Sequence, residues 1–91
     1  MYLFPYNEVE RNARIIIYGA GKVGLDFMRQ VTASGYAQLL CMVDKDYRMI
    51  QGISEVMAPV IAREDLAQFE DVYDVILISV LNRGIALDVK E

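Results

Sequence analysis

The chain contains no histidine and a single cysteine, Cys41. A metal site built from imidazole and thiolate ligands is therefore excluded. One cysteine also excludes a disulfide within the chain, so nothing indicates the secreted, disulfide-stabilised class of protein. Because Cys41 lies inside an apolar run, we expect it to be a small core residue and not a reactive thiol.

Positive charge is scarce as well. Nine Lys and Arg residues stand against thirteen Asp and Glu, which gives a formal net charge of −4 and a pI near 4.7. Proteins that bind nucleic acids or anionic membranes need clustered positive charge, so neither partner is expected. The apolar start at residues 1–6 lacks a basic leader and is too short for a signal sequence or a membrane span. We therefore expect a cytoplasmic protein without membrane insertion.

The length of 91 residues allows one small domain. A two-domain dehydrogenase would need roughly 250 residues. The hydrophobic fraction of 55% is high for so short a chain, which fits a sheet covered on both faces. It also leaves room for apolar surface buried by a partner, either in a homodimer or by docking to a catalytic domain.

One stretch is highly informative, the apolar run Ile15–Tyr18 followed by Gly-Ala-Gly-Lys-Val-Gly. This order is typical of a dinucleotide-binding βαβ unit. Gly19 suits a tight turn from strand to helix, Gly21 leaves the main chain open to a pyrophosphate, and Gly24 allows close helix packing. The amino end of the following helix would direct unpaired N–H groups at the phosphates. The alternative is that the glycines only form the turn.

Asp44 follows the apolar run 39–43, twenty residues after Gly24. An acidic side chain at this place can accept hydrogen bonds from a ribose hydroxyl. Because a carboxylate would also repel a 2′-phosphate, NAD is favoured over NADP. The alternative is an ordinary polar residue at the end of a strand.

A helix is predicted after the glycines, ending at Ser34 and Gly35. Its apolar positions Val23, Phe27 and Val31, with Met28, recur at helical spacing. We expect the polar side chains of this helix to face outward, namely Lys22, Asp26, Arg29 and Gln30. Residues 1–13 form an amino-terminal arm whose apolar side chains pack on the domain or on a neighbour.

The rest of the chain divides into short segments. Strands are predicted at 36–43, 59–61 and 72–80, with a short acidic helix at 63–69. Between 47 and 59 the pattern is irregular, with a short or edge strand at 53–57 and no full crossover helix. The tail, 82–91, has a weak helical pattern.

Joined by right-handed crossovers, these segments predict an α/β fold, a Rossmann-like three-layer sandwich whose mainly parallel sheet has the order 3-2-1-4. The domain would span 14–91, complete or truncated. Its candidate site lies at the carboxyl ends of the strands. The residues predicted to bind a cofactor there are Gly19, Ala20, Gly21, Lys22, Val23, Gly24, Asp44, Lys45, Ser79 and Asn82. Ser79 and Asn82 would bond a ribose or phosphate, or cap the loop.

Four segments together resemble a known bacterial family: Tyr18–Gly24, Val43–Asp46, Ala58–Pro59–Val60 before Glu64–Asp65–Leu66, and Tyr73–Ser79. They resemble the small Rossmann-like domain of polysaccharide and capsule biosynthesis proteins, including the nucleotide-sugar epimerase/dehydratase type. The resemblance covers residues 14 to about 82. It implies an NAD- or CoA-binding type of fold that often precedes a catalytic region.

By this resemblance, Gly19, Gly21 and Gly24 would hold a pyrophosphate and Asp44 a ribose. The chain departs from the family in two respects: Lys45 replaces the second acid often seen after the aspartate, and nothing like a downstream catalytic domain is present. The carboxylates Asp46 and Glu64 have no matched base or nucleophile nearby in sequence, so neither is assigned an acid/base role. We expect no catalysis by these 91 residues alone.

Three hypotheses for function remain. The first is a module that binds NAD, or alternatively CoA or a nucleotide-sugar, within polysaccharide or nucleotide-sugar metabolism. The second is a fragment of an NAD-dependent oxidoreductase or epimerase whose catalytic residues lie elsewhere. The third is a regulatory or dimerisation module without a ligand. We favour the first, with Asp44 as its discriminating residue: replacement by Ala should weaken ligand binding and leave the fold intact.

Overall fold

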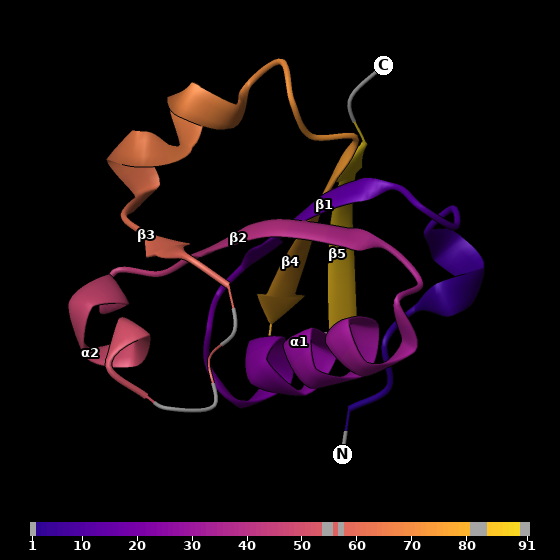
Figure 1. Ribbon diagram of the computed structural model, residues 1–91, viewed down its shortest axis with the longest axis horizontal. Coiled ribbons are helices and arrows are strands. Elements are labelled where there is room, and N and C mark those ends of the chain that lie inside the picture. The colour runs from indigo at the N-terminus through magenta and orange to yellow at the C-terminus, as the bar shows by residue number, and fades with distance from the viewer. Residues whose placement is uncertain (1, 54–55, 57, 81–83, 90–91) are drawn as a thin grey trace.

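The computed structural model describes residues 2–53, 56, 58–80 and 84–89. Its described strands form one sheet in the order β3-β2-β1-β4-β5 (Figure 1). They are β1 (Arg14–Tyr18), β2 (Gln38–Val43), β3 (Val60–Ile61), β4 (Val75–Val80) and β5 (Gly84–Val89). The first four strands are parallel, whereas β5 runs antiparallel to β4. The predicted α/β class and the parallel order 3-2-1-4 are confirmed.

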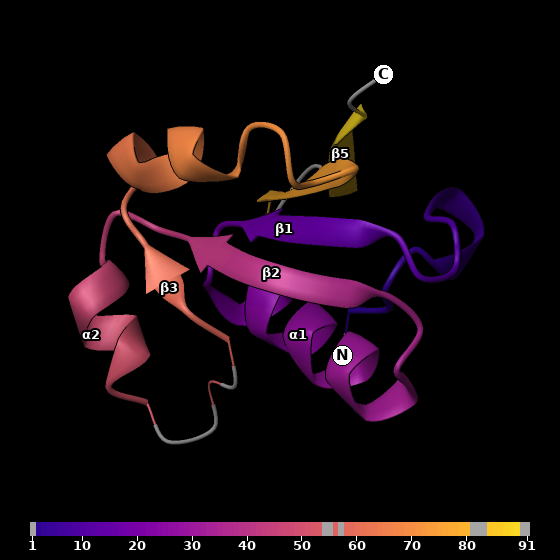
Figure 2. The ribbon, with the colours of Figure 1, turned by 45° about the horizontal axis from the view of Figure 1, so that its top comes forward.

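Both faces of the sheet are covered, as Figure 2 shows. The α-helix α1 (Lys22–Ser34) lies on one face, and the 3₁₀-helix η2 (Arg63–Phe69) lies on the other. Ile15 and Ile17 belong to the cluster under α1, while Ile16 packs on the opposite side with Cys41. All four side chains have 0% exposure, which explains why β1 is a continuous apolar run.

Helix α1 follows its predicted pattern at the apolar positions. Val23, Phe27, Met28 and Val31 are buried, and the helix ends at Gly35, which has a left-handed φ of 66°. The outward orientation expected for Asp26 is wrong, since this side chain is only 6% exposed.

The amino-terminal arm buries Asp26. Tyr2 N–H donates to Asp26 Oδ2 at 3.1 Å, and Arg29 pairs with Asp26 Oδ1 at 2.9 Å. Phe4 is buried and meets the ring of Phe27 edge to face, with centroids 5.8 Å apart. The arm, which includes the short 3₁₀-helix η1 (Tyr6–Glu8), is therefore packed on α1.

The segment between β2 and β3 contains a short helix, α2 (Tyr47–Gln51), where an irregular pattern was expected. Its Gln51 Oε1 accepts a hydrogen bond from Val60 N–H, which ties α2 to β3. Of the edge strand predicted at 53–57, residues 54, 55 and 57 lie outside the described residues, and neither Ile53 nor Val56 is in a strand. The acidic helix expected at 63–69 is present as η2.

The helical tail predicted at 82–91 is wrong, because residues 84–89 form β5. The apolar residues Ile85, Leu87 and Val89 are spaced by two, which is the period of a strand. Pairing of Val80 with Gly84 and of Ile78 with Ala86 makes β4 and β5 antiparallel neighbours. Within the described ranges, no helix is long and apolar enough to cross a membrane.

Candidate functional site

The loop between β1 and α1 begins with a backbone turn that requires glycine. Gly19 has a φ of 100°, a conformation that L side chains rarely adopt. Its N–H donates to Val43 O at 2.7 Å, so the loop leaves β1 in contact with the end of β2. The next residue, Ala20, is 2% exposed and belongs to the core under α1.

Gly24 is required for a different reason. A β-carbon built on Gly24 would lie 1.9 Å from Gly19 O and 3.4 Å from the side chain of Ile17. The first turn of α1 therefore rests directly on the backbone of the glycine loop. This is the close packing that the sequence predicts for the third glycine of the motif.

Gly21 has neither constraint. Its φ of −78° and ψ of −159° are open to ordinary residues, and a β-carbon there would meet nothing within 4 Å. The residue is exposed at the amino end of α1. Gly21 is therefore the one glycine of the motif that neither its backbone angles nor its neighbours among the described residues require.

The amino end of α1 presents backbone donors. The first helical hydrogen bond joins Leu25 N–H to Gly21 O at 2.8 Å, so the N–H groups before Leu25 have no acceptor within the helix. Among the described residues no side chain caps this end, and the first turn carries no acid. Lys22 is exposed beside it, whereas the Val23 side chain is buried in the core. Only the backbone of Val23 could meet a ligand.

Asp44 lies at the carboxyl end of β2, as predicted, and its carboxylate bonds to two main-chain groups. Oδ2 accepts from Ala20 N–H at 2.8 Å, and Oδ1 accepts from Asp46 N–H at 2.9 Å. The side chain is half-buried. Two carboxylate oxygens offer about four acceptor positions, so these bonds leave capacity for a ligand hydroxyl.

A cavity of about 350 Å³ opens beside Asp44. Its lining includes two tyrosine rings, two apolar side chains, and charged side chains of both signs. Its lining residues are Tyr18, Val43, Asp44, Lys45, Tyr47, Ala62, Arg63 and Glu64. Of these, only Asp44 and Lys45 were predicted as site residues. The signal for the residues after β3 was available, because parallel strands end at the same edge and β3 pairs with β2.

Ser79, another predicted site residue, lies near the end of β4. Tyr18 is paired with Ile78, which brings the backbone of Ser79 level with the glycine loop. Asn82 lies outside the described residues, so its predicted role stays a prediction.

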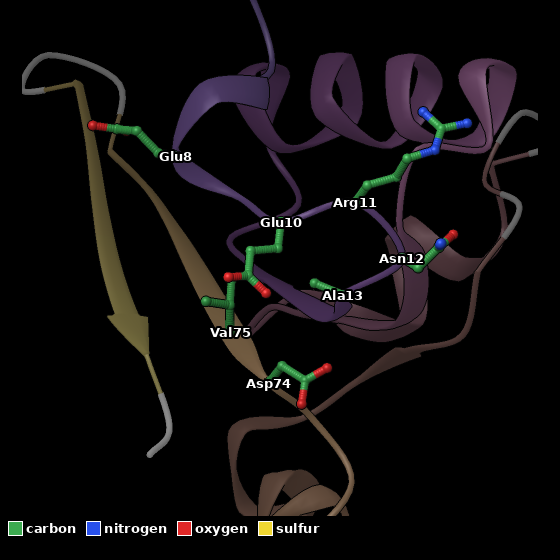
Figure 3. Close-up of a pocket in the computed structure, with 7 residues that line it drawn as sticks. All are labelled: Glu8, Glu10, Arg11, Asn12, Ala13, Asp74 and Val75. Atoms are coloured by element: carbon green, nitrogen blue, oxygen red, sulfur yellow. The ribbon is translucent and has the colours of Figure 1, made fainter.

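A larger cavity, about 480 Å³, lies at the amino ends of β1 and β4, opposite the glycine loop. Its lining is acidic, with Glu8, Glu10 and Asp74. Asp74 is already paired with Arg14, at 2.8 Å between Oδ1 and Nη2. Figure 3 shows the guanidinium of Arg11 turned away from the carboxylates of Glu10 and Asp74. None of the predicted site residues lines this cavity, and we place the candidate site at the other end.

Cys41 is buried in the sheet, and burial raises the pKa of its thiol to about 11. The nucleophilic thiolate is therefore nearly absent at neutral pH. Among the residues that the structure describes, no three His, Cys, Asp or Glu side chains gather in a group that could hold a metal ion.

Comparisons with family models, with curated protein sequences and with solved structures each found no match to this chain.

Proposed function

We propose that the chain is a nucleotide-binding module that holds a pyrophosphate at the glycine loop and a ribose at Asp44. Gly21 carries the argument. Its backbone angles are ordinary, and a β-carbon there would meet no neighbour among the described residues, so the part of the fold that the structure describes gives no reason for glycine at this position. A ligand that approaches the main chain closely does give one.

The charges around Gly21 suit an anion. The amino end of α1 offers N–H groups and the positive end of the helix dipole, and Lys22 adds a cation in the first turn. A pyrophosphate seated there would extend over the edge of the sheet toward Asp44. The cavity beside Asp44, at about 350 Å³, is large enough for a nucleoside and offers Tyr18 and Tyr47 as aromatic surface.

NAD is the preferred ligand in this proposal, with CoA or a nucleotide-sugar as alternatives that use the same phosphate cradle. The family resemblance adds a setting in polysaccharide or nucleotide-sugar metabolism, with a homodimer or a separate catalytic domain as partner. A role as a fragment of an oxidoreductase or epimerase would need catalytic groups from such a partner.

The test is a thermal-shift titration with NAD, NADP, CoA and a UDP-sugar, performed on the wild type and on Gly21→Ala. A ligand that binds only the folded state at 100 times its Kd stabilises it by about 2.7 kcal/mol. We expect NAD to raise the Tm of the wild type but not of Gly21→Ala, whose β-carbon occupies the space of the ligand.

The control variant is Gly52→Ala. Gly52 also has an ordinary φ of −76°, and its β-carbon would lie 3.4 Å from Met49 O, an ordinary contact. It follows the last residue of α2 and is not part of the glycine loop. Gly52→Ala should keep the full response to NAD. If no nucleotide shifts the Tm of the wild type, the proposal is wrong.

One observation favours a ligand-free regulatory or dimerisation module as the second candidate. Both oxygens of Asp44 already accept main-chain hydrogen bonds, so the residue has a role in the fold without any ribose. This candidate predicts that Gly21→Ala and the wild type behave alike with every ligand.

A further inference from the structure

Asp44 joins two segments at the carboxyl edge of the sheet. Its carboxylate bridges Ala20 N–H in the glycine loop and Asp46 N–H in the turn after β2. We propose that Asp44 is a positioning residue for the glycine loop, and that it acts on nucleotide binding through the Ala20 N–H as well as through any contact with a ribose. This inference rests on the proposed function for its ligand and on the observed hydrogen bonds for its mechanism.

The peptide group between Gly19 and Ala20 explains how one hydrogen bond can shape the site. Its N–H is held by Asp44 at 2.8 Å. Its carbonyl oxygen is the atom that a β-carbon on Gly24 would approach to 1.9 Å. The same peptide is thus fixed by Asp44, just after β2, on one side and faces the first turn of α1 on the other. Asp44 therefore sets the orientation of the peptide on which the amino end of α1 rests.

Removing the carboxylate should disturb this arrangement locally. Ala20 is 2% exposed, and a buried N–H without a hydrogen-bond partner destabilises the fold, because it loses the bond to water and gains none in return. A small rotation of the peptide could offer that N–H to another acceptor, but it would also move Gly19 O relative to Gly24. The phosphate-facing donors of α1 would then lose their position, even for a ligand that has no ribose hydroxyl to offer.

Two probes distinguish an action of Asp44 through the Ala20 N–H from an action through a ribose contact alone. They are ADP and 2′,3′-dideoxy-ADP, which share a diphosphate and differ in the ribose hydroxyls. Binding of each is measured by calorimetry to the wild type, Asp44→Ala and Asp44→Asn. A positioning role predicts that Asp44→Ala weakens both probes, the dideoxy compound by roughly tenfold. Asp44→Asn, which keeps one carbonyl acceptor, should recover part of that loss.

A role of Asp44 confined to ribose contact predicts that Asp44→Ala does not weaken binding of the dideoxy compound. Its affinity would be unchanged or higher, because the variant removes a negative charge near a diphosphate. That result would overturn the inference. Asp46→Ala is the matched control: it removes a carboxylate from the same turn but keeps the main-chain N–H that Asp44 binds. It should leave the ratio of the two affinities unchanged.

A measurement without ligand separates the two proposals. Amide hydrogen exchange at Ala20 should be slow in the wild type and in Asp46→Ala, and roughly tenfold faster in Asp44→Ala, with the core of β1 still protected. Asp44→Asn, which keeps one carbonyl acceptor, should lie between the wild type and Asp44→Ala. If the wild type binds neither probe, the proposed function fails while slow exchange at Ala20 still supports the hold by Asp44. Equal rates of exchange at Ala20 in the wild type and in both Asp44 variants would show that Asp44 does not fix the Ala20 N–H.

Discussion

The carbonyl oxygen of Gly19 occupies the space that a side chain on residue 24 would need. An ideal β-carbon at Gly24 lies 1.9 Å from that oxygen, a distance at which backbone must move. We expect Gly24→Ala to lower the free energy of unfolding by about 2 to 3 kcal/mol, since overpacking against backbone has no flexible side chain to yield. Urea denaturation measures the change.

Gly52→Ala serves as the comparison for Gly24→Ala, because its β-carbon meets only an ordinary contact. We expect this variant to stay within about 1 kcal/mol of the wild type. Equal stability of the Gly24→Ala and Gly52→Ala proteins would contradict the close approach of α1 to the glycine loop.

The amino-terminal arm should contribute to stability through Phe4. This side chain is 3% exposed, whereas its neighbour Leu3 is 76% exposed. We expect Phe4→Ala to cost about 3 kcal/mol or more, as for other buried aromatic residues, and Leu3→Ala to cost less than about 0.5 kcal/mol. Thermal and urea unfolding of the pair measures both. A small, equal effect would mean that the arm is not part of the core.

The Tyr36 hydroxyl should hold the arm against the end of α1. Tyr36 Oη lies 2.9 Å from Tyr6 O and 2.7 Å from Val9 O, both in the arm. We expect Tyr36→Phe to lower the free energy of unfolding by about 1 kcal/mol and to speed amide exchange in the arm, with little change in β1. Uniform acceleration across the domain would show instead that the arm and the sheet open together.

The ion pair at the amino end of the sheet gives a pH dependence. Hydrogen bonds from the side chain and backbone of Arg14 lower the pKa of Asp74 from 3.8 to about 2. The carboxylate of Asp74 binds a proton more readily in the unfolded chain than in the folded one, because its pKa is higher there. The contribution of Asp74 to folding stability is therefore fully present above its ordinary pKa. It is lost as the pH falls through about 2.

The stability difference between the wild type and Asp74→Asn should therefore be constant near neutral pH and shrink below pH 3.8. Carbon NMR titration of the Asp74 carboxyl group reads the pKa directly. In Arg14→Gln this pKa should return toward 3.8. An unchanged pKa in that variant would assign the shift to another cause.

The parts of the fold that could be predicted depend on short-range patterns. The run at Ile15–Tyr18, the turn at Gly19 and the helix that ends at Gly35 each follow from local backbone chemistry. Asp26 was predicted wrongly because helical periodicity shows which face meets the sheet, but not that an arm 24 residues earlier covers another face. The hydrogen bond from Ala20 to Asp44 likewise depends on strand register, which no single segment encodes.

The tail was missed for a related reason. A spacing of two at Ile85, Leu87 and Val89 fits a strand, but only the antiparallel partner β4 fixes that choice. The cavity residues Tyr47, Arg63 and Glu64 were also missed. The predicted order already placed β3 beside β2, so Arg63 and Glu64 could have been named as residues that follow β3 at the same edge. Tyr47 begins α2, in a segment whose sequence pattern is irregular.

The burial of Cys41 has a practical consequence. It is the sole thiol of the chain, and it lies in β2, an interior strand of the sheet, with 0% exposure. A thiol reagent can reach it only when the sheet opens, so the labelling rate under native conditions reports the frequency of that opening. A compound that stabilises the folded state should slow the labelling of Cys41. Added compounds can therefore be screened by this labelling rate, without a dye or an engineered label.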